Sequence, residues 1–308
     1  MDAVKEKAHT DRQAHIQLIN RRLDAVAAML NDDSYQPCEG LFKVGVDLGT
    51  ADIQTIVLDA DDNPIACYMD WADVVRDGVV VDYFGAAQIV REQLRRASER
   101  LEITIEKAAT SFPPGTEPQI SANVVEAAGI EVCDLIDEPS SVARLLELQQ
   151  GAVVDVGGGT TGTAIIKGGQ VVASEDDPTG GRHITLSLAG HFKVPYEEAE
   201  EIKLNHPGRD VLSLVAPVIL RMADLVKEHI AGHSPREIYL TGGCCALPNF
   251  APIFTAELTG VDIIMPSQPL HLTPLAIAAA YGRTAYGKAS FEKTSFEKTS
   301  TMHSGQYR

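Results

Sequence analysis

The feature of this sequence that most restricts its fold is a pair of similar Asp-Gly-Thr turns, one in each half of the chain. The first, DLGT at 47–50, ends the apolar run at 42–48. The second, DVGGGTT at 155–161, ends the apolar run at 151–157. In both halves two further strand-like runs follow the turn, which indicates an internal duplication. The sequence therefore predicts an α/β fold of two equivalent lobes whose turns face each other across a cleft.

Apolar periodicity predicts the elements of both lobes. Gly168-Gly169 between apolar runs and the turn DADDNP at 59–64 each predict a connection between antiparallel strands. Strands are expected at 42–48, 53–60, 65–70, 107–112, 129–136, 151–157, 161–167, 170–175, 236–241 and 261–265. Helices are expected at 84–101, 118–128, 139–149, 183–192, 196–206, 211–231, 246–259 and 274–282.

Composition, together with the internal duplication, divides the chain into four segments. These are an N-terminal amphipathic helix with a linker (1–40), a first lobe (41–149), a second lobe (150–282) and a tail (283–308). The helix carries an apolar stripe that packs on its own domain or docks onto a partner, and the sequence leaves both open. The tail repeats SFEKT and is expected to be disordered. The stripe consists of Ile16, Ile19, Leu23, Val26 and Leu30.

Charge and cysteine content exclude several functions. The 308 residues include 43 Asp and Glu against 26 Lys and Arg, for a net charge of −17. Such an acidic chain is a poor partner for nucleic acid or for an anionic membrane. The five cysteines form no Cys-x-x-Cys pair, which favours reduced thiols over disulfides or a zinc site. With no signal peptide and no apolar run of about 18 residues, we expect a cytoplasmic protein.

The two turns have the composition of a phosphate-binding site. Glycine backbone lets a phosphate approach closely, and N–H and hydroxyl groups can donate to it. Asp47 and Asp155 are suited to holding a hydrated Mg²⁺. The motif at 155–161 is not a P-loop, because no Gly-Lys-[Ser/Thr] follows, nor a Rossmann fingerprint, because a strand follows. A third motif, YLTGGCCALPNF at 239–250, would let a flat nucleoside lie against Gly242 and Gly243.

Each motif alone also has an ordinary structural reading, as a hairpin, a flexible turn or a strand–turn–helix. Their order, however, resembles the actin, DnaK and sugar-kinase superfamily of ATPases, whose ribonuclease H-like lobes enclose a nucleotide. DEPSSVA at 137–143 and TPLAIAAAYG at 273–282 are similar to its two connecting segments. A closer resemblance, over about 41–282, is to the EutJ proteins of ethanolamine-utilisation operons. It rests on DWADVVRDGVVVDYFGA (70–86), AATSFPPGTEP (108–118) and TGGRHIT (179–185).

The resemblance implies a cleft that binds ATP or ADP with Mg²⁺. Glu138 would help to position the attacking water, while Asp47 and Asp155 would hold the hydrated metal. The phosphates would be cradled by Gly49, Thr50, Gly157, Gly158, Gly159, Thr160 and Thr161. The nucleoside would be held by Glu200, Lys203, Gly242 and Gly243.

Two departures weaken the expectation of rapid hydrolysis. An acid, Asp52, follows the first turn, where it is unhelpful to a phosphate unless it points away or meets metal. The catalytic lysine of DnaK-type ATPases has no clear counterpart, since Lys43 and Lys107 do not match and Arg76 is only a stand-in. We therefore expect nucleotide binding with at most weak ATPase activity.

The leading functional hypothesis is an ATP-binding, chaperone-like protein of ethanolamine utilisation. Its protein clients would be the shell or the ethanolamine-degrading enzymes of a bacterial microcompartment. The alternatives are an actin-like scaffold, a catalytically weak nucleotide sensor and a small-molecule kinase of the same superfamily. Trp71, Tyr83 and Phe84 are interpreted as a packed cluster, with a partner surface as the alternative. Cys244 and Cys245 are interpreted as thiols packed behind the nucleotide.

Overall fold

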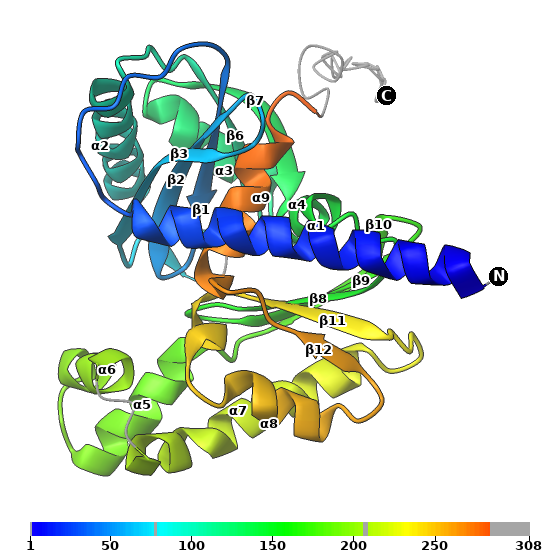
Figure 1. Cartoon of the computed structure of the whole chain (residues 1–308). Helices are drawn as coiled ribbons and strands as arrows, with labels where there is room; N and C mark the ends of the chain where they lie inside the picture. The colour runs from blue at the N-terminus through cyan, green and yellow to red at the C-terminus, as the bar shows by residue number, and fades with distance from the viewer. Residues whose placement is uncertain (1, 77–78, 206–208, 284–308) are drawn as a thin grey trace, which may run out of the picture.

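Two lobes, each built on a five-stranded sheet, form the protein (Figure 1). The computed structural model describes residues 2–76, 79–205 and 209–283. The first sheet has the order β3-β2-β1-β6-β7 and the second β10-β9-β8-β11-β12. The strands of the first are β1 (Phe42–Leu48), β2 (Asp52–Asp59), β3 (Pro64–Trp71), β6 (Lys107–Phe112) and β7 (Glu131–Asp137). Those of the second are β8 (Gln150–Val156), β9 (Thr161–Lys167), β10 (Gln170–Asp177), β11 (Glu237–Thr241) and β12 (Asp262–Ile264).

The two sheets have the same topology. In each, the first three strands form an antiparallel meander, and the remaining two are added in parallel. Gly168 and Gly169 have φ of 62° and 74°, as a two-residue hairpin turn requires. The predicted α/β fold of duplicated lobes is confirmed. A separate two-stranded hairpin, β4 (Val75–Arg76) with β5 (Val79–Val80), was not predicted, because two-residue strands show no periodicity.

Helices cover the outer face of each sheet, and three more lie between the lobes. The first sheet is covered by α2 (Tyr83–Leu101) and α3 (Pro118–Ala127). The second is covered by α5 (Gly181–Phe192), α7 (Arg209–His229) and α8 (Phe250–Glu257), with α6 (Tyr196–Asn205) beside α5. The layer between the lobes contains α1 (Asp2–Ala28), α4 (Glu138–Leu145) and α9 (Leu272–Ala280). The described residues thus form three apolar clusters rather than one.

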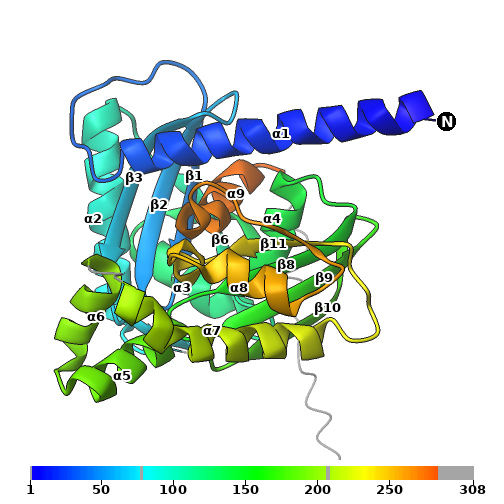
Figure 2. The same cartoon turned by 60° about the horizontal axis from the view of Figure 1, so that its bottom comes forward.

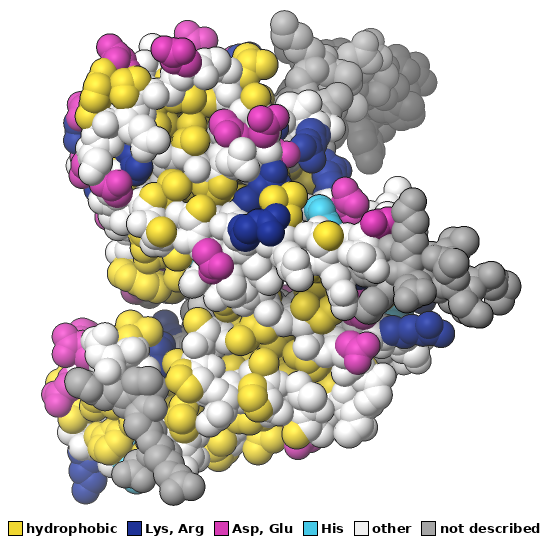
Figure 3. Space-filling model, viewed as in Figure 1, with side chains coloured by type: hydrophobic (Ala, Val, Ile, Leu, Met, Phe, Trp, Pro, Cys, Tyr) yellow, Lys and Arg dark blue, Asp and Glu magenta, His cyan; other side chains and the backbone are white. Residues whose placement is uncertain are grey.

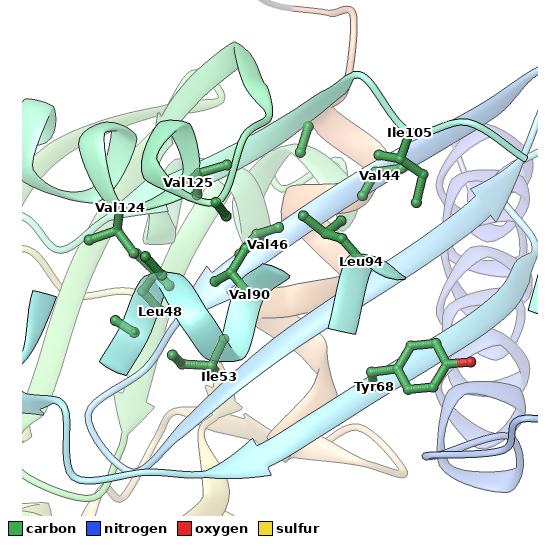
Figure 4. Close-up of a cluster of buried hydrophobic side chains, with 14 of the residues drawn as sticks. Val44, Val46, Leu48, Ile53, Tyr68, Val90, Leu94, Ile105, Val124 and Val125 are labelled. Carbon is green, nitrogen blue, oxygen red and sulfur yellow. The ribbon is translucent and has the colours of Figure 1, made fainter. Parts of the chain in front are cut away.

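Strand alternation decides which side chains enter which layer. Val44, Val46 and Leu48 of β1 point to the outer face, where they pack against Val90 of α2 and Val124 of α3 (Figure 4). The intervening residues of β1 therefore point inward, toward the other lobe.

Glycine at position 45 lets the two layers meet closely. A Cβ built on Gly45 would lie 2.4 Å from the backbone nitrogen of Ala278 in α9. All nine residues of α9 are buried, and the helix is rich in alanine and contacts β1, β2 and β6. Small side chains on α9 and the missing side chain on β1 thus allow the helix to lie against the sheet.

The N-terminal helix packs on its own chain. Ile19, Leu23 and Val26 are at most 1% exposed and belong to the central cluster with residues of α4, α9 and both sheets. This part of the predicted stripe is therefore occupied within the fold. The tail at 284–308, including the SFEKT repeat, lies outside the described residues.

One packing prediction is wrong. Trp71 is 60% exposed and Phe84 is 84% exposed, although they were interpreted as part of a packed cluster. Trp71 is the last residue of β3, where the sheet ends, and Phe84 lies in the first turn of α2. Tyr83 is the exception, since its hydroxyl donates to the backbone oxygen of Asn123 at 2.5 Å.

Candidate functional site

The same alternation places the two aspartates of the predicted turns on the inner faces of their sheets. In β8, Ala152, Val154 and Val156 belong to the outer cluster of the second lobe, so Asp155 points inward. In β1, Asp47 has the equivalent position. Both carboxylates are therefore directed toward the space between the lobes, as the duplication predicts.

The two turns meet across this space. A Cβ built on Gly158 would lie 2.8 Å from the Cβ of Ala51, so residues of opposite lobes are in contact here. Away from this contact the lobes separate, and Figure 3 shows an indentation between them at its left margin. The glycine at position 158 is needed because a side chain there would push the turns apart.

Carboxylates from both lobes surround the contact. Burial, with the charges of Asp52 and Asp155, raises the pKa of Asp47 to about 7. Burial also raises the pKa of Asp155 to about 6, and the Thr273 hydroxyl, 3.4 Å from its Oδ2, opposes this rise. Asp47 also accepts a hydrogen bond on its Oδ1 from the Ser111 hydroxyl, at 3.2 Å. Among the described residues no three acidic, histidine or cysteine side chains are grouped closely enough to bind a metal ion directly, so a cation here would be held through water.

Glu138 joins this group from the connection between the lobes. It is the first residue of α4, and Asp137 caps the helix by accepting a hydrogen bond from the Ser140 backbone N–H at 3.0 Å. Burial raises the pKa of Glu138 well above its ordinary value, and the charges of Asp47 and Asp155 add to the rise. The three predicted catalytic residues are therefore near enough for their charges to act on one another.

Asp52 also faces inward. It lies on the same face of β2 as Gln54, the residue that pairs with Asp47 of β1. Burial raises its pKa to about 6, and the Gln54 amide, 3.4 Å from Oδ2, lowers it. Gln54 connects this side of the first lobe to the segment before α9, since its Nε2 donates to Leu270 O at 3.3 Å and its Oε1 lies 2.7 Å from His271 Nδ1. Sequence reasoning noted Asp52 as a departure but not this connection.

The second turn is braced by the TGG motif that begins α5. The N–H groups of Gly181 and Arg182 donate to the carbonyls of Gly157 and Gly158 at 3.0 and 2.8 Å. A Cβ on Gly180 would lie 2.6 Å from the backbone carbon of Gly159, so no side chain fits there.

The threonines of this turn differ in their availability. Thr161 is fully buried, and its hydroxyl donates to Thr179 O at 2.5 Å. That hydroxyl is therefore used by the fold. Thr160 and, in the first turn, Thr50 are partly exposed.

Glu200 and Lys203, predicted to hold the nucleoside, lie beside α5, the helix that braces the second turn. Lys203 of α6 pairs with Glu200 Oε1 at 2.5 Å and donates to the Thr185 hydroxyl of α5 at 3.0 Å. The Cys244 thiol donates to Gly157 O at 3.2 Å, and burial raises its pKa to about 11. The thiol thus packs behind the turn. Thr185 was not assigned a role from the sequence, although it closes the TGGRHIT motif.

Gly242 connects the nucleoside motif to the carboxylates. It has φ of 92°, and a Cβ there would lie 2.4 Å from Asp155 Oδ1. Gly243, next in the chain, begins a 3₁₀ turn (Gly243–Ala246). A Cβ built on it would lie closest to the side chain of Leu270.

Replacing Gly242 with alanine should therefore cost at least about 3 kcal/mol, because strain at positive φ adds to overlap with Asp155 and with the backbone of Val156. The matched control is Gly260→Ala, at φ of 83° with no atom within 4 Å, which should cost only about 1 kcal/mol. Chemical denaturation of both variants measures the difference. Equal losses would show that the close contacts of Gly242 with Asp155 and Val156 impose no constraint.

The two lysines considered for catalysis are elsewhere. Lys43 pairs with Asp62 at 2.5 Å and Lys107 with Glu131 at 2.9 Å. Both lie at the start of strands whose other ends carry Asp47 and Ser111. The side chain of Arg76 lies outside the described part of the structure.

Two duplicated sheets of this order, with paired acidic turns and two connecting helices between them, define the actin-like ATPase fold. Solved structures agree: MreB5 of Spiroplasma citri bound to AMPPNP aligns with a TM-score of 0.62 at 17% identity, over 79% of this chain and 96% of that one. Family models for the MreB/Mbl protein and for the cell division protein FtsA match residues 69–206 and 152–282.

Much greater similarity is found to one group of proteins. The ethanolamine utilization protein EutJ of Escherichia coli K12 is 46% identical over 264 residues, which cover 86% of this chain and 94% of the relative. The crystal structure of EutJ from Carboxydothermus hydrogenoformans has a TM-score of 0.81 and 43% identity, over 85% of this chain and 98% of that one. The chain belongs to the EutJ family. Among the described residues, no helix is both long and apolar enough to cross a membrane.

Proposed function

We propose that this protein binds ATP or ADP with Mg²⁺ between its lobes and couples the bound nucleotide to the angle between them. The observation that carries the proposal is that the acidic groups of both lobes meet where the two glycine turns touch. A phosphate chain placed between the turns would contact both lobes at once. Its binding would therefore favour one arrangement of the lobes over others.

The acidic groups fit a hydrated Mg²⁺. Burial and, after it, their neighbouring charges raise the pKa of Asp47 and of Glu138, so a nearby cation would be stabilised. Asp47 and Asp155 would accept hydrogen bonds from its water ligands. When bound, the metal would neutralise charge on the phosphates, while Glu138 would orient a water molecule from the first turn of α4.

The biological setting we propose is ethanolamine utilisation, because the related EutJ proteins are named for that process. The protein would act there as a cytoplasmic, chaperone-like factor on enzymes or shell proteins of a bacterial microcompartment. A change in lobe angle would alter the surface presented to such clients. This role rests on family membership, whereas nucleotide binding rests on the geometry of the site.

A second candidate function is a nucleotide sensor that hydrolyses ATP slowly. The ion pairs of Lys43 and Lys107 at the far ends of their strands favour it, because neither side chain is placed to neutralise phosphate charge. Phosphate release under single-turnover conditions separates the two functions. A sensor would hold ATP for many minutes, whereas a cycling chaperone would release phosphate faster when a client is added.

Calorimetric titration with ATP and ADP, with and without Mg²⁺, tests the proposal directly. We expect micromolar, Mg²⁺-dependent binding by the native protein and at least about tenfold weaker binding by Asp155→Ala. The control is Asp224→Ala, which removes an exposed carboxylate on α7. Lack of binding by the folded native protein would refute the nucleotide function.

A further inference from the structure

The helix α1 is attached to both lobes. At its C-terminal end it is joined to the first lobe, where Arg22 donates to Asp61 O at 2.6 Å. Just beyond the helix, Leu30 forms a parallel bridge with Cys67, and the Asn31 N–H donates to Cys67 O at 2.9 Å. This end therefore extends along the edge of β3.

Further toward the N-terminus, α1 contacts the second lobe. Arg12 forms an ion pair with Glu237 of β11, and its guanidinium donates to the Tyr239 hydroxyl at 2.6 Å. Directly after Ile19 of the buried stripe, Asn20 Oδ1 accepts a hydrogen bond from the Ser267 backbone N–H at 3.0 Å. These contacts fix α1 to β11 and to the segment after β12 in the second lobe.

Between these two attachments, α1 crosses the helices that connect the lobes (Figure 1 and Figure 2). His15 Nε2 lies 2.9 Å from Leu145 O at the last turn of α4, the helix whose first residue is Glu138. Leu23 and Val26 are buried in the cluster that contains residues of α4 and α9. A change in the angle between the lobes would therefore have to move α1 relative to at least one of its attachments.

We infer that α1 is a strap across the hinge that holds the two lobes in the arrangement seen here, with the glycine turns in contact. Releasing its attachment to the second lobe should allow the turns to separate more often. The inference needs no bound nucleotide, so its test is made on the nucleotide-free protein and its failure would leave the proposed function untouched.

The first test measures the distance between the lobes by double electron–electron resonance. Spin labels are placed on exposed positions of α3 and α7, using Glu126→Cys and Asp224→Cys, in a background where the partly exposed Cys38 and Cys133 are serine. We expect Arg12→Ala to broaden the distance distribution toward longer distances. Arg12→Lys, which keeps the charge opposite Glu237, should restore much of the native distribution.

A matched control removes an arginine that acts within one lobe. Arg95→Ala breaks ion pairs with Glu92 and Glu99, all on the exposed face of α2, and should leave the distribution unchanged. If Arg12→Ala gives the native distribution, or if Arg95→Ala broadens it equally, α1 is not a strap.

The second test locks the strap instead of releasing it. Asn20→Cys with Ser267→Cys joins positions that already share hydrogen bonds. Oxidation should slow amide hydrogen exchange at 47–52 and 155–160, and reductant should restore it, whereas Arg12→Ala should speed exchange there up to about fivefold. Exchange at these turns that is the same in the oxidised and reduced forms would overturn the inference.

Discussion

Replacing Gly45 with alanine should destabilise the protein by about 3 kcal/mol or more, one of the largest effects expected of any single methyl group in this chain. The added Cβ would lie 2.4 and 2.5 Å from the backbone N and Cα of Ala278. Backbone atoms of a buried helix cannot rotate out of the way as a flexible side chain can. Helix α9 would therefore have to shift away from the first sheet.

The control for this variant is Gly190→Ala in α5. No atom lies within 4 Å of a Cβ at position 190, and the residue is exposed. Alanine there should stabilise the protein by up to about 1 kcal/mol, because glycine is a poor helix former. Urea denaturation of both variants measures the effects. A loss below about 1 kcal/mol in Gly45→Ala would mean that α9 is not held against β1 as the structure shows.

The second large effect concerns pH. Burial with neighbouring acids raises the pKa of Asp47 from 3.8 to about 7, so the folded state binds a proton more tightly than the unfolded state does. Between these two pKa values the folded state carries more protons, and its stability therefore falls as pH rises. The loss is complete above pH of about 7, where the carboxylate is charged in both states.

Asp47→Asn removes this loss. It should leave stability nearly unchanged at pH 4 and increase it at pH 8 by an amount on the order of 2 kcal/mol. Asparagine also keeps an oxygen to accept the hydrogen bond from Ser111. Thermal denaturation across this range measures the effect, with the exposed Asp224→Asn as control. Equal changes at both pH values would show that Asp47 is not a destabilising charge in the folded protein.

Addition of Mg²⁺ and ADP should make the native protein more stable than Asp47→Asn at pH 8, the reverse of their order without ligand. If the proposed function is correct, the native protein gains stability from a ligand that its carboxylates help to hold, and Asp47→Asn gains less. The same denaturation experiment, repeated with the ligand, thus distinguishes the destabilisation caused by the Asp47 charge from the contribution of that charge to ligand binding.

Periodicity was sufficient to predict the two sheets because each half repeats the same order of strands and turns. Periodicity was less successful in predicting where individual helices begin and end. The helix expected at 246–259 begins only at Phe250, since Pro248 favours an extended Leu247, which has ψ of 138°. The expected helix at 139–149 ends at Leu145, and Glu147 soon after has φ of 52°.

The candidate site was predictable where glycine and aspartate mark the turns, and less so where the supporting side chains come from other elements. Ser111 and Thr273 hydrogen-bond to Asp47 and Asp155 from β6 and α9, yet a single serine or threonine in an apolar run carries no distinctive pattern. Gln54 and His271 are far apart in sequence and meet only because the segment before α9 returns to the first lobe.

The attachment of the N-terminal segment to β3 gives the chain a chemical reporter of its own. Cys67 has no exposed surface, and burial raises its pKa to about 12, so its thiol is protected from alkylation while Leu30 and Asn31 cover the strand. Detachment of that segment would uncover a thiol without any engineered label. The rate at which Cys67 reacts therefore records how often the N-terminal segment leaves the body of the native protein.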